Sequence, residues 1–397
     1  MCIEQTMESP LVDYIIKKEG EETLYELTKY LMGESDKELP QIKGVCWREK
    51  DRVIINEDRE FVDINTLPFP YSTEKTREFL ITYRTFSTNY SLKTVEPVVM
   101  ELSRGCPYSC KFCYNRFFSK NIARIKSIDK IEKELTILKD KYNIKEVGFY
   151  DDSLCGGNRK RIEELCELLQ KLGLKWQSAI RANYIDDKMA ERLEKSNCHH
   201  VFIGLESNND RILKKFNKGY TSEIVYRAVR TLRKYKIYVS YSVIIGYPGE
   251  TREDLNNLLD FVDEVRELHP NSGIAVQPFL PLPGTDLYQE SIDLGFTPPS
   301  KLEDWADFAH DEFKAPWVSY YKDLSAIYLV TYVGFRYKWY LKNSKIAFIY
   351  YLFHKISLWR WEKRYFSFYF EGIMFKLYKK FGKPFIYIQR QLENLYL

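Results

Sequence analysis

Short apolar runs alternate with amphipathic stretches between residues 95 and 283. The apolar runs have the length of β-strands and fall at residues 98–102, 146–150, 175–180, 200–205, 238–245 and 274–280. Segments with helical spacing of apolar residues, such as 128–141 and 161–172, lie between them. This alternation predicts parallel βα units.

A different pattern precedes the alternation. Residues 11–16 are strand-like, and residues 21–32 carry leucines at helical spacing. Gly33 stands where a helix C-cap is expected. We therefore predict a strand and a helix within residues 1–40.

The end of the chain differs in composition from the rest. Between Lys314 and Leu397, 15 Lys and Arg residues stand against 4 Asp and Glu residues, a balance of +11, whereas the whole chain carries +4. The same segment holds 26 of the chain's 62 aromatic residues. The shift marks a domain boundary, and we predict a helical, aromatic and basic region at 296–397.

Composition also excludes several classes of protein. A hydrophobic fraction of 45% over 397 residues is sufficient for a large core, which excludes a disordered chain. The N-terminus lacks the features of a signal peptide, and no apolar run reaches the roughly 18 residues of a membrane span. Eight cysteines then fit a reducing cytosol. We expect a cytoplasmic protein, with membrane association through the basic end as an option.

Three cysteines, Cys106, Cys110 and Cys113, form a C-x-x-x-C-x-x-C motif just after the first apolar run. Thiolates are the ligands of iron–sulfur clusters, and this spacing lets one loop present several of them. Three ligands leave one iron of a cubane open. A zinc site would need further ligands from a second short cluster, which the sequence lacks. A disulfide framework would need an even number.

The motif and its flanks, Arg104 to Tyr108 with Phe112 before the last cysteine, resemble the radical S-adenosylmethionine (SAM) superfamily. The resemblance covers about residues 11–295. It implies an α/β fold with a partial TIM-type (β/α)6 radical SAM barrel at 95–295. It also implies a [4Fe-4S] cluster on the three cysteines and SAM on the open iron. Reductive cleavage of SAM would then give a 5′-deoxyadenosyl radical.

The resemblance is closest to the branch with an N-terminal cobalamin-binding domain. The resemblance also identifies residues 41–94 as the linker into the barrel. A doubly wound domain needs on the order of 100 residues, but only about 40 precede this linker. The resemblance therefore identifies residues 1–40 as a remnant of that domain. Whether cobalamin binds, through a partner chain for instance, stays open.

Functional groups of TIM-type barrels gather where the strands end. The resemblance places SAM-binding residues there: Phe112, Asp151, Asp152, Arg181, Glu206, Ser207 and Gly246. Either aspartate can accept a hydrogen bond from the SAM ammonium, and Arg181 matches its carboxylate. Glu206 and Ser207 are candidates for the ribose hydroxyls or the methionine end, and Gly246 lets the backbone approach adenine. The alternatives are helix caps and ion pairs at the barrel rim.

Other reactive side chains are interpreted as structural. Cys155 follows the aspartate pair but is expected to be a buried thiol. His199 and His200 precede a strand and are expected to pack or to lie at the surface.

Three roles stay open for the aromatic, basic end of the chain. Residues 346–358 are too short to span a bilayer, but with flanking Lys and Arg they suit an interfacial helix on anionic lipid. A helical cap over the barrel mouth is the second role. Single-stranded nucleic acid also suits basic and aromatic residues, but nucleic acid is not the expected partner.

The expected function is that of a radical SAM enzyme that abstracts hydrogen from an unactivated carbon. Methylation, cyclisation or rearrangement of a hydrophobic, lipid-like small molecule would follow, with a reducing protein as electron donor. Two alternatives stay open. A tRNA-modifying methylthiotransferase would normally show a second set of three cysteines, and a non-catalytic membrane-associated scaffold would carry a degenerate barrel.

Overall fold

The computed structural model describes residues 2–72, 98–308, 313–340, 347–367 and 373. Its centre is a six-stranded parallel sheet in the order β11-β10-β9-β8-β7-β4. The strands are β4 (Val98–Met100), β7 (Glu146–Phe149), β8 (Lys175–Ala179), β9 (Cys198–Glu206), β10 (Tyr238–Ile245) and β11 (Ser272–Pro278). Each lies within two residues of its predicted bounds. The predicted α/β class with a partial (β/α)6 barrel is confirmed.

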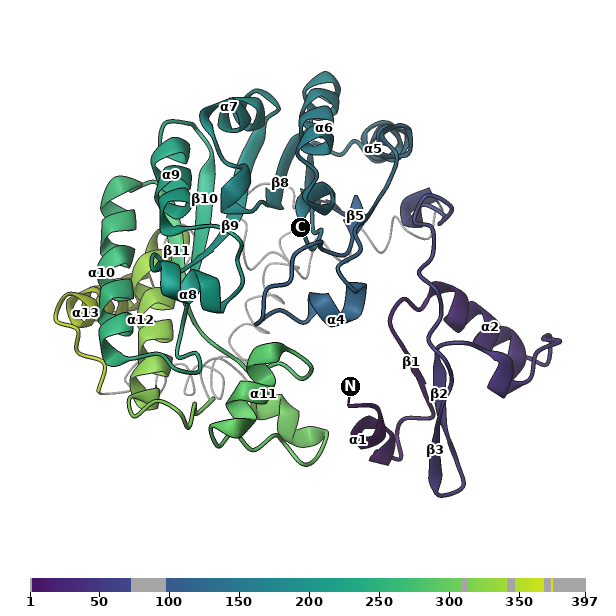
Figure 1. Ribbon diagram of the computed structural model, residues 1–397. Helices are drawn as coiled ribbons and strands as arrows, with labels where there is room; N and C mark the ends of the chain where they lie inside the picture. The colour runs from purple at the N-terminus through teal and green to yellow at the C-terminus, as the bar shows by residue number, and fades with distance from the viewer. Residues whose placement is uncertain (1, 73–97, 309–312, 341–346, 368–372, 374–397) are drawn as a thin grey trace.

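Long helices connect successive strands and lie outside the curved sheet (Figure 1). They are α5 (Ile128–Tyr142), α6 (Arg159–Leu172), α7 (Asp187–Lys195), α9 (Ser222–Leu232) and α10 (Arg252–Leu268). Local signals set their ends. For example, the Ser127 hydroxyl accepts a hydrogen bond from the Lys130 backbone N–H, and Asn143 ends the same helix in the left-handed conformation.

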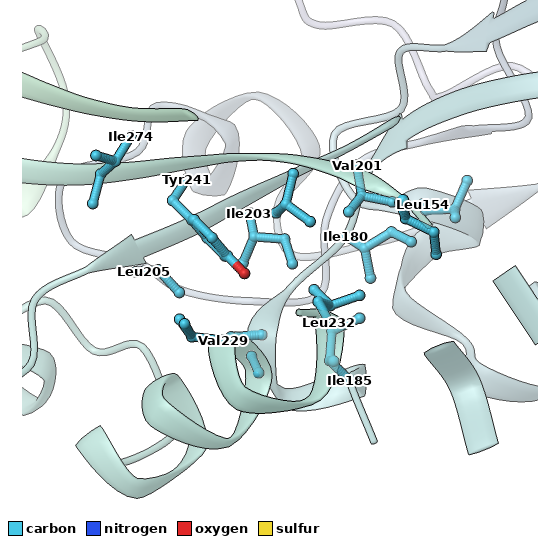
Figure 2. Packing of buried hydrophobic residues seen from close by; sticks show 14 of the residues in the cluster. Leu154, Ile180, Ile185, Val201, Ile203, Leu205, Val229, Leu232, Tyr241 and Ile274 are labelled. Atoms are coloured by element: carbon cyan, nitrogen blue, oxygen red, sulfur yellow. The ribbon is translucent and has the colours of Figure 1, made fainter. Parts of the chain in front are cut away.

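The main core lies between the sheet and these helices (Figure 2). Alternate residues of β10 point into it, so that Val239, Tyr241, Val243 and Ile245 are at most 1% exposed. Burial of one such side chain stabilises the fold by about 1.5–3 kcal/mol. The other residues of β10 are partly exposed and point away from the helices. The packed core between sheet and helices therefore fixes the positions of the strand ends.

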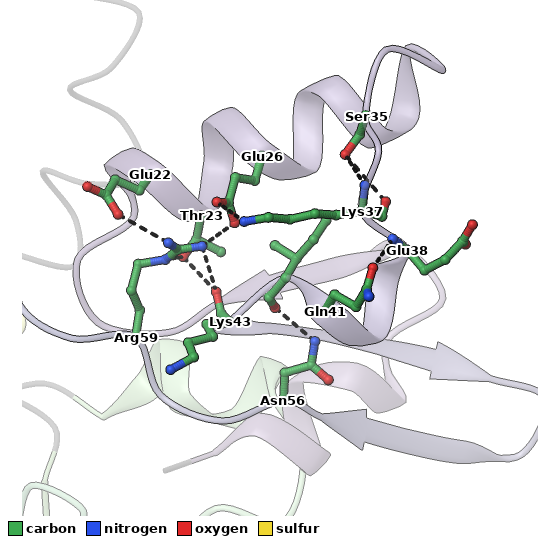
Figure 3. Close-up of polar contacts among 11 residues, drawn as sticks. Glu22, Thr23, Glu26, Ser35, Lys37, Glu38, Gln41, Lys43, Asn56 and Arg59 are labelled. Carbon is green, nitrogen blue, oxygen red and sulfur yellow. Dashed lines mark hydrogen bonds and ion pairs between the residues drawn. The ribbon is translucent and has the colours of Figure 1, made fainter.

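An N-terminal unit precedes the barrel. Helix α1 (Ile3–Glu8) is followed by a three-stranded antiparallel sheet in the order β1-β2-β3 and by α2, which packs on it. The bounds are β1 (Tyr14–Ile16), α2 (Glu21–Leu31), β2 (Val45–Glu49) and β3 (Arg52–Ile55). Arg59 joins the strands to α2, because its Nε donates to Thr23 Oγ1 at 2.9 Å and its Nη1 to Glu22 Oε2 at 3.1 Å (Figure 3).

This sheet crosses the boundary predicted at residue 40, since β1 pairs with β2. The pairing is antiparallel, whereas a doubly wound domain has a mostly parallel sheet. The assignment of residues 1–40 to a cobalamin-binding remnant stays a prediction.

Beyond the barrel, α12 (Tyr321–Tyr340) packs on β11 at one edge of the sheet, and α13 (Ala347–Glu362) packs on α12 (Figure 1). The helix predicted at 346–358 thus exists and ends four residues later than predicted. Within the part of the chain that the structure describes, no helix combines the length and the hydropathy required to cross a bilayer.

Candidate active site

The cysteine loop follows a short strand, β5 (Ser103–Arg104), and leads into α4 (Asn115–Ser119). It begins at Gly105, whose φ of +83° favours glycine. A Cβ at this position would lie 2.1 Å from the carbonyl oxygen of Ile122. The Gly105 N–H donates to Asp152 Oδ2 at 2.9 Å. The turn that aims Cys106 therefore depends on glycine and on the end of β7.

Backbone contacts fasten the middle of the loop to two other segments. The Lys111 N–H donates to the Phe216 carbonyl at 3.0 Å, and the Lys111 carbonyl accepts from the Leu287 N–H at 3.2 Å. Phe112 meets the ring of Phe216 edge-on, with 5.3 Å between centroids. Phe112, predicted to contact the cofactor, thus packs against the segment after α8 (Asp210–Lys215), and its cofactor contact stays a prediction.

All three cysteines of the motif are free thiols, and Cys110 is the most buried of them. Burial raises the pKa of Cys113, and the charges of Cys110, Cys106 and Asp152 raise it further. The Cys113 N–H donates to the Cys110 carbonyl at 3.1 Å, which holds these two cysteines in one turn. No three His, Cys, Asp or Glu side chains among the described residues converge on a point where one ion would sit. Each thiolate of a cubane binds a different iron, so the donor set and its single loop fit a cluster.

The two neighbouring aspartates have different environments. Asp151 is buried, and its Oδ1 accepts from the Leu102 N–H at 2.8 Å while its Oδ2 accepts from Ser103 Oγ at 2.5 Å and the Cys155 N–H at 3.1 Å. Burial raises the pKa of Asp151 to about 6, although these hydrogen bonds oppose the shift. Asp151 therefore holds the strand end together, as does the buried Cys155, whereas the exposed Asp152 faces the cysteine loop.

Arg181 lies directly against the cysteine loop. Its Nη1 is 3.5 Å from Cys110 Sγ, and its Nη2 donates to the Lys218 carbonyl. Its guanidinium carbon stacks 3.6 Å from the centroid of the Tyr108 ring. The Tyr108 hydroxyl in turn bonds the hydroxyl of Tyr184. Arg181 is thus a positive, stacked neighbour of one predicted cluster ligand.

A buried ion pair closes the end of β9. Lys218 Nζ lies 2.9 Å from Glu206 Oε1, and the two side chains are only 6% and 9% exposed. Burial by itself would lower the pKa of Lys218, but the combined attraction of Glu206, Tyr220 and Cys110 outweighs it, so the pKa is raised. Glu206 has a φ of +64°, and its carboxylate covers Gly204, where a Cβ would come within 2.2 Å of Oε1.

Sequence reasoning missed Lys218, because a lysine in a turn after a helix gives no signal of burial. The neighbouring Ser207 is also buried, and its Oγ accepts from the Asn209 N–H at 3.1 Å. Glu206 and Ser207 therefore have partners within the protein, and their predicted contacts with SAM stay predictions.

The turn after β10 meets the C-terminal region. Gly246 has a φ of +71°, and a Cβ there would lie 2.4 Å from Leu324 Cδ1 of α12. Its carbonyl accepts from Trp317 Nε1 at 2.9 Å, and its N–H donates to Glu250 Oε2 at 2.7 Å. Burial raises the pKa of Glu250 to about 8. Trp317 and Leu324 of the C-terminal region thus hold the Gly246 turn in position.

The site as a whole lies at the carboxyl ends of the parallel strands. The structure brings Asp152 and Arg181 to the cysteine loop. It leaves Asp151 and Ser207 inside local networks. The two histidines expected to pack or to lie at the surface contact other strands of the sheet. His200 Nε2 forms a hydrogen bond with Ser240 Oγ at 2.8 Å, and His199 Nε2 lies 2.8 Å from Glu146 Oε1.

Residues 100–262 match the family model described as the radical SAM superfamily. An uncharacterized methyltransferase of Pyrococcus horikoshii is 30% identical over 288 residues, which are 72% of this chain and 59% of that protein. Bacteriochlorophyllide d C-12(1)-methyltransferase of Chlorobaculum tepidum is 30% identical over 195 residues, 48% of this chain and 42% of the enzyme. The chain thus spans about half the length of these relatives.

Among solved structures, the apo form of the cobalamin-dependent SAM radical enzyme OxsB aligns with a TM-score of 0.60 and 20% identity. The alignment covers 90% of this chain and 57% of that one. At this identity the likeness concerns the fold.

Proposed function

Because this chain belongs to the radical SAM superfamily, we propose that it is a radical SAM enzyme of the methyltransferase type. Cys106, Cys110 and Cys113 would hold a [4Fe-4S] cluster, and SAM would bind its open iron. Together these groups supply, when bound and reduced, a 5′-deoxyadenosyl radical that abstracts hydrogen from an unactivated carbon. The observation that carries the proposal is the single braced loop with three free thiols at the strand ends.

The protein's own residues would orient and balance this site. Asp152, whose exposed carboxylate lies beside the first cysteine, would accept hydrogen bonds from the SAM ammonium. Asp151 is less accessible than Asp152, because it is buried and its oxygens already accept three hydrogen bonds, so its predicted contact with SAM stays a prediction. Arg181 has its positive charge beside Cys110, where it would offset part of the negative charge of three thiolates.

Relatives suggest the kind of substrate. Both curated relatives named above are methyltransferases by name, and one acts on a bacteriochlorophyllide. We propose methyl transfer to a carbon of a hydrophobic, lipid-like or pigment-like small molecule, with electrons from a reducing protein. Cyclisation and rearrangement are the other outcomes open to the same radical. Cobalamin would have to be bound with the help of a segment or chain outside residues 1–40.

Anaerobic reconstitution with iron and sulfide tests the cluster. The wild-type protein should take up about four irons per chain and gain visible absorbance. Cys110→Ala should lose most of both, whereas Cys166→Ala, which removes a buried thiol of α6 outside the motif, should retain them. Equal iron in the two variants would contradict the assignment of the ligands.

Product analysis tests the reaction. After reduction in the presence of SAM, the loaded wild-type protein should release 5′-deoxyadenosine, and methyl transfer should also give S-adenosylhomocysteine. Asp152→Asn should weaken SAM binding by about tenfold, the equivalent of one charge-assisted hydrogen bond. A fully loaded cluster with no nucleoside product would favour the scaffold alternative.

A further inference from the structure

The outer side of α13 carries four exposed large apolar side chains. Tyr351, Leu352, Ile356 and Trp359 are 40%, 45%, 39% and 52% exposed. At about 100° per residue they fall within one arc of roughly 140° on the helix. Buried Arg360 lies outside that arc. We call these four exposed residues the α13 apolar face.

The neighbouring helix α10 has a polar outer side. Its exposed residues are all polar: Arg252, Glu253, Asn256, Asn257, Asp260 and Glu267. A helix that is apolar on its outer as well as its inner side is typical of burial in protein or contact with lipid. The α13 apolar face therefore departs from the pattern expected of a cap with a solvated surface.

Charged side chains lie among these apolar residues. Lys355 and Glu362 are exposed within the same arc, and Lys363 is exposed directly after the end of the helix. The segment from Lys314 to Leu397 carries a balance of +11. Trp and Tyr with neighbouring Lys are typical of the boundary between lipid and water, where the rings sit at headgroup level. Lysines near such a surface are attracted to anionic lipid.

The inner side of α13 is fastened to the barrel. Trp361 Nε1 donates to Asp263 Oδ1 at 2.7 Å, and its ring meets Phe335 of α12 at 5.0 Å between centroids. Just after the helix, Arg364 lies 2.8 Å from Asp260 and 2.9 Å from Asp263 of α10. Because these contacts fix the inner side of α13 on the barrel, the α13 apolar face points away from the barrel.

We propose that the α13 apolar face docks on the surface of an anionic lipid bilayer, with α13 parallel to the membrane plane. A second copy of this chain fits less well, because an isologous contact would set the face against itself and bring like-charged lysines together. Nucleic acid fits less well, because Leu352 and Ile356 offer no ring for a base to stack on.

Vesicle flotation of the full-length, cluster-reconstituted protein tests the proposal. Wild-type protein should float with vesicles of phosphatidylglycerol and phosphatidylcholine in equal parts, and much less with phosphatidylcholine alone. Leu352→Ser/Ile356→Ser/Trp359→Ser should weaken binding by about tenfold or more. Lys355→Glu/Lys363→Glu should weaken it by about tenfold and reduce its salt dependence.

A matched control is available on α2. Leu24 and Leu31 are 55% and 56% exposed. The variant Leu24→Ser/Leu31→Ser therefore removes two apolar side chains that are at least as exposed as those of α13, but from another surface, and it should leave flotation unchanged. The proposal is overturned if wild-type protein does not float, or if the triple variant floats as well as wild type. It is also overturned if wild type forms a dimer in sedimentation that the triple variant loses, because the face would then bind a second copy. Since flotation needs no turnover, these outcomes are independent of the proposed reaction.

Discussion

Replacing Lys218 by methionine tests the role of the buried ion pair. Met keeps most of the apolar length of lysine but removes the ammonium. Glu206, whose side chain is 9% exposed, would then keep a carboxylate in a site with little access to water. Breaking a buried pair by removing one partner costs about 3–5 kcal/mol, because the remaining charge loses its compensation.

Urea denaturation followed by far-UV circular dichroism measures this loss. Lys218→Met and Glu206→Gln should each lower the free energy of unfolding by about 3–5 kcal/mol. The double variant should lose less than the sum of the two by about 2–3 kcal/mol, because the pair is absent in either single variant. The exposed Lys214 provides the matched control, and Lys214→Met should stay within about 0.5 kcal/mol of wild type.

The reasoning would be refuted by a Lys218→Met protein within about 1 kcal/mol of wild type. It would equally be refuted by strict additivity in the double variant, because additivity would mean that the two groups act independently.

Three further predictions concern the rest of the site. Gly105 has a φ of +83°, and a Cβ there would lie 2.1 Å from the carbonyl oxygen of Ile122. Gly105→Ala should therefore lower the free energy of unfolding by at least ~2 kcal/mol and reduce iron uptake. As a control, Gly173 has a φ of +67° but no atom within 4 Å of an added Cβ. Gly173→Ala should lower the free energy of unfolding by only ~1 kcal/mol and leave iron uptake intact. Arg181→Gln should lower the midpoint potential of the cluster by about 60 mV in a redox titration followed by electron paramagnetic resonance, since it removes a positive donor near Cys110 Sγ; an unchanged potential would contradict this. The pKa of Glu250 is raised to about 8 by burial, so the folded state holds a proton that the unfolded state releases above a pKa of 4.5, and stability should fall as the pH rises between these values. Glu250→Gln should flatten that slope in melting curves recorded across the range, and an unaltered slope would contradict the assignment.

Much of the fold could be predicted because its signals are local. Strands such as β10 are recognised by a short apolar run between helical patterns, and the observed Tyr238–Ile245 coincides with the prediction. The cysteine motif is local as well, because one loop supplies all three thiols. A local motif also specifies its own chemistry, which is why the family was evident from the sequence.

The antiparallel pairing of β1 with β2 was not predicted. Pairing between strands separated by a helix depends on which edges meet, and a pattern of apolar residues does not record that. The predicted division at residue 40 therefore fell within one sheet.

The sequence by itself determined the order of the elements and the chemistry of the cysteine loop, because both depend on residues close together in the chain. Only the tertiary structure decided which neighbouring aspartate is exposed: Asp151 turns into a network of backbone donors, and Asp152 turns toward the loop. It also decided that Lys218 neutralises Glu206 and that Arg181 reaches Cys110 across 71 residues. Burial and charge compensation are set by what folds around a side chain, and residues distant in the chain supply those surroundings.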